Sequence, residues 1–161
     1  MLRRVFLAGV VGLVPALAGA AELVEATGPQ GELPKQKLVI VTQGGVRHEF
    51  QVEIARTPQQ QMTGEMFRPT VPADGGMLFV WDRVQESDMW MHNTVAPLDM
   101  LFIGVDGTVS HVAEDAVPES LAIISSGGPV RATLEVAAGT VRRLGIRVGD
   151  RVLNASLGTG P

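Results

Sequence analysis

Short apolar segments, each followed closely by a turn signal, recur along most of this chain. Residues 37–42 are β-branched and apolar, and residues 46–55 return with apolar and polar side chains in alternation. Between them, Gly44 and Gly45 supply the positive φ angles of a tight hairpin. This spacing predicts a fold built from many short strands.

The same pattern predicts six further strands and two short helices. The predicted strands are residues 77–81, 87–92, 98–105, 109–113, 131–136 and 151–155. One helix starts at the hydroxyl cap Thr57 with Pro58 in its first turn and stops at Gly64, and the other covers residues 140–144 before Gly145. Residues 118–129 look the least ordered of the internal stretches. The predicted fold class is therefore mainly β with two short helices (α+β), in a compact barrel-like or sandwich-like single domain.

Length and charge bound the organisation and the function. A chain of 161 residues suits one domain, which we place at residues 37–156, with a flexible lead-in at 21–36 and a tail at 157–161. The net charge of -4 argues against a nucleic-acid partner. The absence of cysteine excludes disulfides, thiolate metal sites and cysteine nucleophiles.

The first twenty residues predict export. Arg3 and Arg4 precede an apolar segment at residues 5–17, and Ala18-Gly19-Ala20 forms a small-residue cleavage site. Arg3-Arg4-Val5-Phe6-Leu7 also resembles a twin-arginine signal, although the ordinary Sec route is favoured. We therefore expect a periplasmic or secreted protein with no membrane contact after cleavage.

Three ordered segments resemble one known family. They are Met62-x-Gly64-x-Met66-Phe67-Arg68 with Gly76-Met77-Leu78-Phe79-Val80, then Trp90-Met91-x-Asn93-Thr94-x-x-Pro97-Leu98-Asp99-x-Leu101-Phe102-Ile103, then Leu134-Glu135-x-x-x-Gly139 with Gly145-Ile146-x-x-Gly149-Asp150. Together they resemble the domain of unknown function 192 family. The resemblance implies a small, often exported, β-rich barrel-like domain whose biochemical role is not established. Glu65 stands where this family usually has an apolar residue, and His92 stands where it usually has lysine.

Polar residues inside these apolar segments are the candidate site. Arg68, Asn93 and Asp99 form either a structural network, in which Arg68 pairs with Asp99, or a cleft that binds an unidentified small ligand or protein partner. Trp90 and His92 complete the predicted ligand-binding set. On this interpretation the protein is a binding or accessory module without a cofactor.

Two alternatives come from other classes of protein. A small hydrolase or transferase would use His92 with Asp99 as an acid/base pair, although no nucleophile motif accompanies them. A copper(I) chaperone would use Met89, Met91 and His92, since thioether and imidazole groups suit that soft ion and Trp90 could cover it. The two methionines would, however, face away from His92 on a regular strand.

Overall fold

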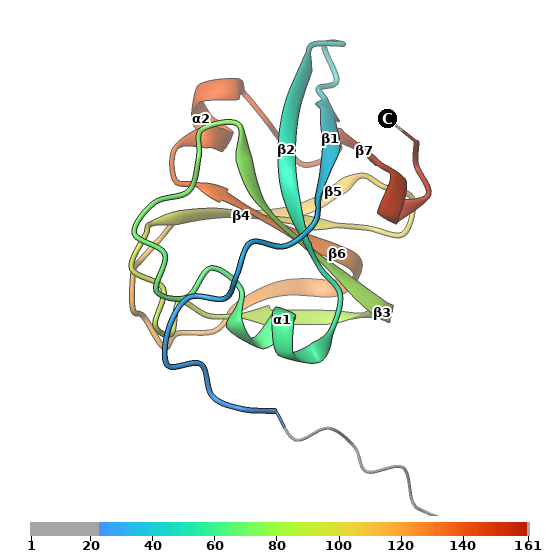
Figure 1. The fold of residues 1–161 in the computed structure, drawn as a ribbon. Helices are drawn as coiled ribbons and strands as arrows, with labels where there is room; N and C mark the ends of the chain where they lie inside the picture. The colour runs from blue at the N-terminus through green and yellow to red at the C-terminus, as the bar shows by residue number, and fades with distance from the viewer. Residues whose placement is uncertain (1–22, 161) are drawn as a thin grey trace, which may run out of the picture.

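The structure, a computed structural model, describes residues 23–160, so the predicted signal peptide lies outside the described residues. Seven strands and two short helices make up the fold (Figure 1). The strands are β1 (Lys35–Val41), β2 (Arg47–Ala55), β3 (Gly75–Met89), β4 (Leu98–Ile103), β5 (Val109–Ala116), β6 (Ile124–Ala137) and β7 (Arg151–Asn154). The helices are α1 (Pro58–Thr63) and α2 (Thr140–Leu144), and a 3-10 helix covers Ala155–Leu157. Among the described residues, no helix is long and apolar enough to cross a lipid bilayer.

All seven strands belong to one curled sheet in the order β5-β4-β6-β3-β2-β1-β7. Neighbouring strands are antiparallel except for β2 and β3, which are parallel and are joined through α1. The two edges of the sheet meet at one end, where Thr108 bridges Arg151 and the amide of Val109 donates to the carbonyl of Asp150 at 2.8 Å. The sheet is thus a curled half-barrel, which confirms the predicted fold class.

Local sequence signals explain several of these elements. The amide of Thr42 donates to the carbonyl of Val46 across the predicted hairpin, where Gly45 has a φ of 82°. At the start of α1, the Thr57 hydroxyl accepts from the amide of Gln60, and the Gln60 side chain accepts from the amide of Thr57. The predicted hairpin, helix cap and helix end at Gly64 are confirmed.

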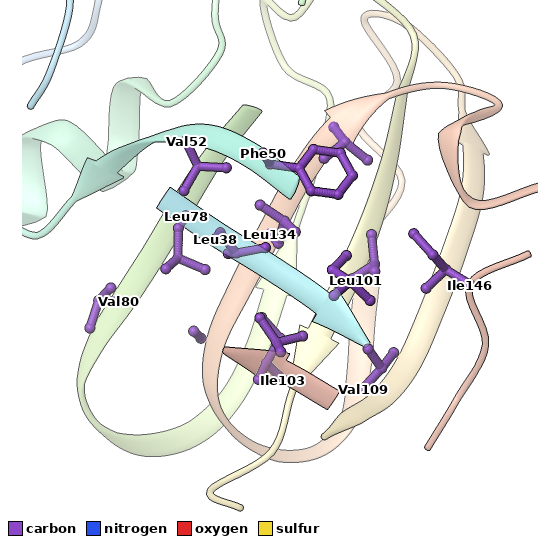
Figure 2. Close-up of a cluster of buried hydrophobic side chains, with 14 of the residues drawn as sticks. Leu38, Phe50, Val52, Leu78, Val80, Leu101, Ile103, Val109, Leu134 and Ile146 are labelled. Atoms are coloured by element: carbon purple, nitrogen blue, oxygen red, sulfur yellow. The ribbon is translucent and has the colours of Figure 1, made fainter. Parts of the chain in front are cut away.

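One face of the sheet encloses the main core. Leu78, Leu101 and Leu134 come from three neighbouring strands and are fully buried together (Figure 2). Phe50 and Ile146 also belong to this cluster. The period-2 pattern of the strands accounts for this face, because alternate residues point to the same side of a sheet.

The outer face of the central strands is buried as well. Met77 and Phe79 of β3 pack in a second cluster with Met100 and Phe102 of β4. These four side chains are at most 1% exposed. Because both faces are covered there, residues 77–80 of β3 and 100–103 of β4 form continuous apolar runs in the sequence.

The middle of the chain differs from the prediction. β3 is one strand with two bulges rather than two separate strands, and β6 begins at Ile124 inside the stretch expected to be least ordered. Asp88 pairs with Ser125 and Glu86 with Pro129, so β3 and β6 form a long ribbon. This pairing supplies order that the glycine- and proline-containing local sequence does not indicate.

The predicted flexible lead-in is also anchored where the structure describes it. The Gln30 amide nitrogen donates to the carbonyls of Gln60 at 3.1 Å and Gly64 at 2.9 Å, which satisfies acceptors at the end of α1. The amide of Leu33 donates to the Glu53 carboxylate at 2.7 Å, and β1 begins at Lys35. Distant partners therefore hold a segment that has no periodicity of its own.

Asp99 is a structural anchor. Its side chain has no exposed surface, and its two carboxylate oxygens accept from the amides of Asp115 and Val141, each at 2.9 Å. The second bond satisfies an amide in the first turn of α2, whose own preceding residue, Gly139, has no side chain to cap it. Asp99 thus ties β4 to the end of β5 and to α2.

We predict that Asp99→Asn lowers the free energy of unfolding by about 2 kcal/mol, because a neutral amide cannot accept two charge-assisted hydrogen bonds equally well. Urea denaturation at neutral pH measures this loss. Asp82→Asn, at an exposed carboxyl, is the matched control and should change stability little. Equal stability of the two variants would contradict the role assigned to Asp99.

Candidate functional site

Arg68 is held by carboxylates, but Asp99 is not among them. Its guanidinium donates to both oxygens of Glu53, at 2.7 and 3.0 Å, and to Glu65 at 3.3 Å. Burial alone would raise the pKa of Glu53, but the Arg68 guanidinium and the Leu33 amide hold that pKa below its usual range. The predicted Arg68–Asp99 pair is therefore wrong, since the other two carboxylates reach Arg68 and backbone amides occupy Asp99.

His92 and Asp99 also fail to form the predicted acid/base pair. The His92 Nε2 atom lies 3.1 Å from the side-chain nitrogen Nδ2 of Asn93 and 3.6 Å from a Glu25 carboxylate oxygen. Asp99 has both oxygens engaged by backbone amides. The acid/base dyad of the hydrolase hypothesis is therefore not assembled in this structure.

The remaining predicted residues shape a turn that follows β3. Asn93 adopts a left-handed backbone with a φ of 53°, and its carbonyl accepts from the amide of Phe67 at 2.8 Å. The rings of Trp90 and His92 lie against each other at an angle of 40°, with their centroids 4.9 Å apart. Among the described residues, no hydrogen bond joins any two of Arg68, Asn93 and Asp99, so the structure does not gather them as one polar cleft.

A different group of polar side chains does share a cavity. We call this space of about 180 Å³ the carboxyl cavity. It lies among α1, the residues that follow it, parts of β3 and the last residues of β6. Its lining residues are Gln61, Met62, Thr63, Gly64, Glu65, Met66, Phe79, Asp88, Met89, Trp90, Thr94 and Glu135.

Glu135 is the most unusual residue of the carboxyl cavity. It lies on β6 directly between Met77 of β3 and Met100 of β4, both fully buried, and it is itself only 4% exposed. No hydrogen bond from another described residue reaches its carboxyl group. Burial raises the pKa of Glu135 well above its ordinary value, and the nearby Glu65 raises it further. Burial and the neighbouring Glu65 therefore both favour the protonated form of this carboxyl group.

Glu65 is a second buried acid in the same cavity. It follows α1 and is 3% exposed. Burial raises its pKa, and the charge of Arg68 on its other side partly offsets that rise. Glu65 also lines a neighbouring cavity of about 200 Å³ that contains Arg68 and Glu53. It therefore separates the Arg68–Glu53 ion pair from the carboxyl cavity.

The ionisable residues that line the carboxyl cavity are all acids. Three acidic residues, Glu65, Asp88 and Glu135, line it, and no lysine, arginine or histidine is among its lining residues. A guest that brings hydrogen-bond donors or positive charge would complement these groups. Trp90 and Phe79 contribute aromatic surface to the same walls.

A second cavity adjoins it, and we call it the thioether cavity. It measures about 210 Å³ and is lined by Leu23, Glu25, Ala26, Met62, Met66, Trp90 and His92. Met62, Met66 and Trp90 line both cavities. Met91, which the copper hypothesis used, is fully buried and lines neither.

Clusters of the usual metal-binding side chains are absent from residues 23–160. No group of three or more histidine, cysteine, aspartate or glutamate side chains there is placed to bind one metal ion. The carboxyl cavity therefore has acidic groups without the arrangement of a divalent-cation site.

Sequence reasoning did not single out Glu135 as a site residue. Leu134 and Val136 alternate with it, and on a strand with one solvated face that alternation predicts a glutamate in water. The available signal was its position in a strand so rich in apolar residues. Glu65 also carried a signal in the sequence. It stands between the apolar residues Met62 and Met66, at a position where the family that the chain resembles usually has an apolar side chain.

We predict that Arg68→Met lowers the free energy of unfolding by about 3 kcal/mol, because it leaves Glu53 and Glu65 without their cation. Arg68→Lys should lose less, since it retains the charge but not the paired contact with both Glu53 oxygens. Urea denaturation checks both. A loss no larger than that of Arg83→Met, at an exposed arginine, would contradict this assignment.

Comparison with solved structures finds close likenesses. A protein from Sinorhizobium meliloti, described as a suggested transcription regulator, is 44% identical and superposes with a TM-score of 0.77 over 79% of this chain and 98% of its own. A protein of unknown function from Novosphingobium aromaticivorans is 36% identical with a TM-score of 0.72, over 84% and 93% of the two chains. None of the curated proteins compared with this chain matches it.

A family model covers most of the described chain. The model of the domain of unknown function 192 (DUF192) family, described as "Uncharacterized ACR", matches residues 39–153. This range begins within β1 and ends within β7, so it includes both Glu65 and Glu135. The chain belongs to the domain of unknown function 192 family.

Proposed function

We propose that this protein is a small-ligand-binding module and that the carboxyl cavity is its binding site. The observation that carries the proposal is the carboxyl group of Glu135, which is buried on an apolar layer and lacks a hydrogen bond from any other described residue. Burial without a hydrogen-bond donor disfavours the charged form of this carboxyl group. A ligand that donates a hydrogen bond to Glu135 would stabilise that form.

The charge of the cavity favours a small organic cation, such as a primary amine or a guanidinium group. Glu65, Asp88 and Glu135 supply carboxyl groups that can pair with such a cation, and the cation in turn favours their ionised forms. Trp90 and Phe79 line the cavity, and an aromatic ring whose face meets a cation adds cation–π attraction. The methionine side chains form apolar walls that can hold the carbon skeleton of such a ligand.

The proposal moves the ligand site away from the one expected from sequence. A site at Arg68 would bind anions. Glu53 already occupies that guanidinium, because both of its terminal nitrogens donate to the Glu53 carboxylate. Trp90 keeps its predicted place as a ligand-binding residue. His92 and Asn93 lie at the adjoining turn, and Asp99 serves the backbone instead.

We also propose that the module acts outside the cytoplasm, on the strength of the export signal in its first twenty residues. The transcriptional role suggested for the Sinorhizobium protein is not carried over. A net charge of -4 gives the present chain no electrostatic attraction for nucleic acid.

The ligand-free protein should lose stability as the pH rises above the ordinary glutamate range. The folded state holds the Glu135 proton more tightly than the unfolded chain does, so the free energy of unfolding falls until the pH passes the raised folded pKa. Each unit of that rise is worth about 1.4 kcal/mol. Glu135→Gln should be more stable than the parent protein at neutral pH and should lose this part of the pH dependence.

Melting temperatures measured at about one-unit steps from pH 4 to pH 9 test this prediction. Glu119→Gln, at an exposed carboxyl, is the matched control and should follow the parent protein. A parallel fall in stability for the parent and for Glu135→Gln would show that Glu135 is not the group responsible.

Butylamine should bind the parent protein, whereas butanol, which has the same carbon skeleton without the charge, should not. Ionisation of Glu135 accompanies amine binding, so binding releases protons and becomes tighter as the pH rises. Isothermal titration calorimetry in two buffers with different ionisation enthalpies measures both effects.

Glu135→Gln should abolish butylamine binding, and Glu119→Gln should leave it intact. If butanol bound as well as butylamine, the cavity would be recognising carbon skeleton rather than charge. If guanidinium and butylamine both failed to bind, the proposal of a cation-binding module would be overturned.

A further inference from the structure

We propose that the thioether cavity is a binding site for a soft monovalent metal ion, copper(I) or silver(I). The ligands are the thioether sulfurs of Met62 and Met66 and the imidazole of His92, with the indole of Trp90 against the ion. This site uses no carboxyl group of the carboxyl cavity and does not depend on the proposed amine-binding function.

Two segments of the chain bring these side chains together. Met62 lies in the last turn of α1, and Met66 follows the end of that helix at Gly64. Trp90 and His92 belong to the turn after β3, so a loop and the whole of β3 separate them from Met66 in the sequence. All four line one cavity of about 210 Å³. Tertiary structure therefore gathers two sulfurs, one imidazole and one indole that the sequence separates.

The chemical types suit a soft ion. Thioether and imidazole ligands select copper(I), whereas hard divalent ions prefer carboxylate and carbonyl oxygens. The face of Trp90 can add cation–π attraction. Leu23 and Ala26 contribute apolar wall to the same cavity, and the Glu25 carboxylate, 3.6 Å from His92 Nε2, adds negative charge that favours a cation.

The cavity methionines differ from those that only fill the core. Met77, Met91 and Met100 are fully buried in the outer apolar cluster. Met62 is half-buried, and both it and Met66 line a cavity. Thioether sulfur at a cavity wall can meet an ion that enters, whereas sulfur inside a packed cluster cannot do so without rearrangement.

His92 can supply a lone pair. Its Nε2 atom lies 3.1 Å from the Asn93 amide nitrogen, which can donate to it while the imidazole proton resides on Nδ1. A metal ion would take the place of that hydrogen bond at Nε2. The His92 side chain is 31% exposed, so an ion can reach it from solvent.

Titration of the protein with silver(I), followed by tryptophan fluorescence, provides the first test. We expect one equivalent of silver(I) to quench Trp90, and Trp90→Phe should remove that quenching while Trp81 still emits. Anaerobic competition with bicinchoninate then gives the copper(I) affinity. Met62→Leu, Met66→Leu and His92→Gln should each weaken copper(I) binding about tenfold or more, and each tenfold step corresponds to about 1.4 kcal/mol.

Met91→Leu is the matched control, because it removes one thioether of similar volume from a position outside the cavity. It should leave copper(I) affinity unchanged. X-ray absorption of the copper-loaded protein should show sulfur and nitrogen scatterers together, and thermal unfolding of each variant confirms that it folds.

Three results would overturn the proposal: no copper(I) binding in competition with bicinchoninate, equal weakening by Met91→Leu and Met62→Leu, or a copper spectrum without sulfur. If Glu135→Gln abolished copper(I) binding while Met62→Leu did not, the metal would belong to the carboxyl cavity. His92→Gln should weaken copper(I) binding and keep butylamine binding, because His92 lines the thioether cavity and not the carboxyl cavity.

Discussion

Burial of residues 132–136 of β6 on both faces of the sheet is the constraint on which the other features depend. The strand pairs with β3 on one side and β4 on the other, so its backbone is satisfied within the sheet. Leu134 faces the enclosed core, and Glu135 faces the outer layer between two methionines. Because that outer layer is covered, the carboxyl group of Glu135 is removed from bulk water, which raises its pKa and leaves it facing the carboxyl cavity.

The acids near α1 have different roles because their surroundings differ. Glu53 accepts paired bonds from Arg68 and keeps a lowered pKa, whereas Glu65 is more deeply buried and has a raised one. Beside α2, Asp99 is fully buried, and both of its oxygens accept from backbone amides. A carboxyl group that is already paired stabilises the fold, and one without a partner remains available to a ligand.

Patterns confined to a few residues predicted local structure well. Thr57, Pro58 and Gly64 mark α1 because each acts through its own backbone or that of a near neighbour. The alternation of Phe50 and Val52 marks the buried face of β2 for the same reason. The predictions that failed required a distant partner. Arg68 selected Glu53 rather than Asp99, and Ile124 joined β6 because β3 lies beside it.

The sequence by itself determined the β-rich fold class, most of the strands, the two helices and the family, since these depend on local conformational preference and on the order of motifs. Tertiary structure alone decided which faces are covered, which acid meets Arg68, and that Met62 and Met66 share a cavity wall with His92. The physical reason is that burial and pairing are properties of separation in space. Alternation along a strand predicts the face to which a side chain points, but it does not predict which residues from other elements contact that side chain.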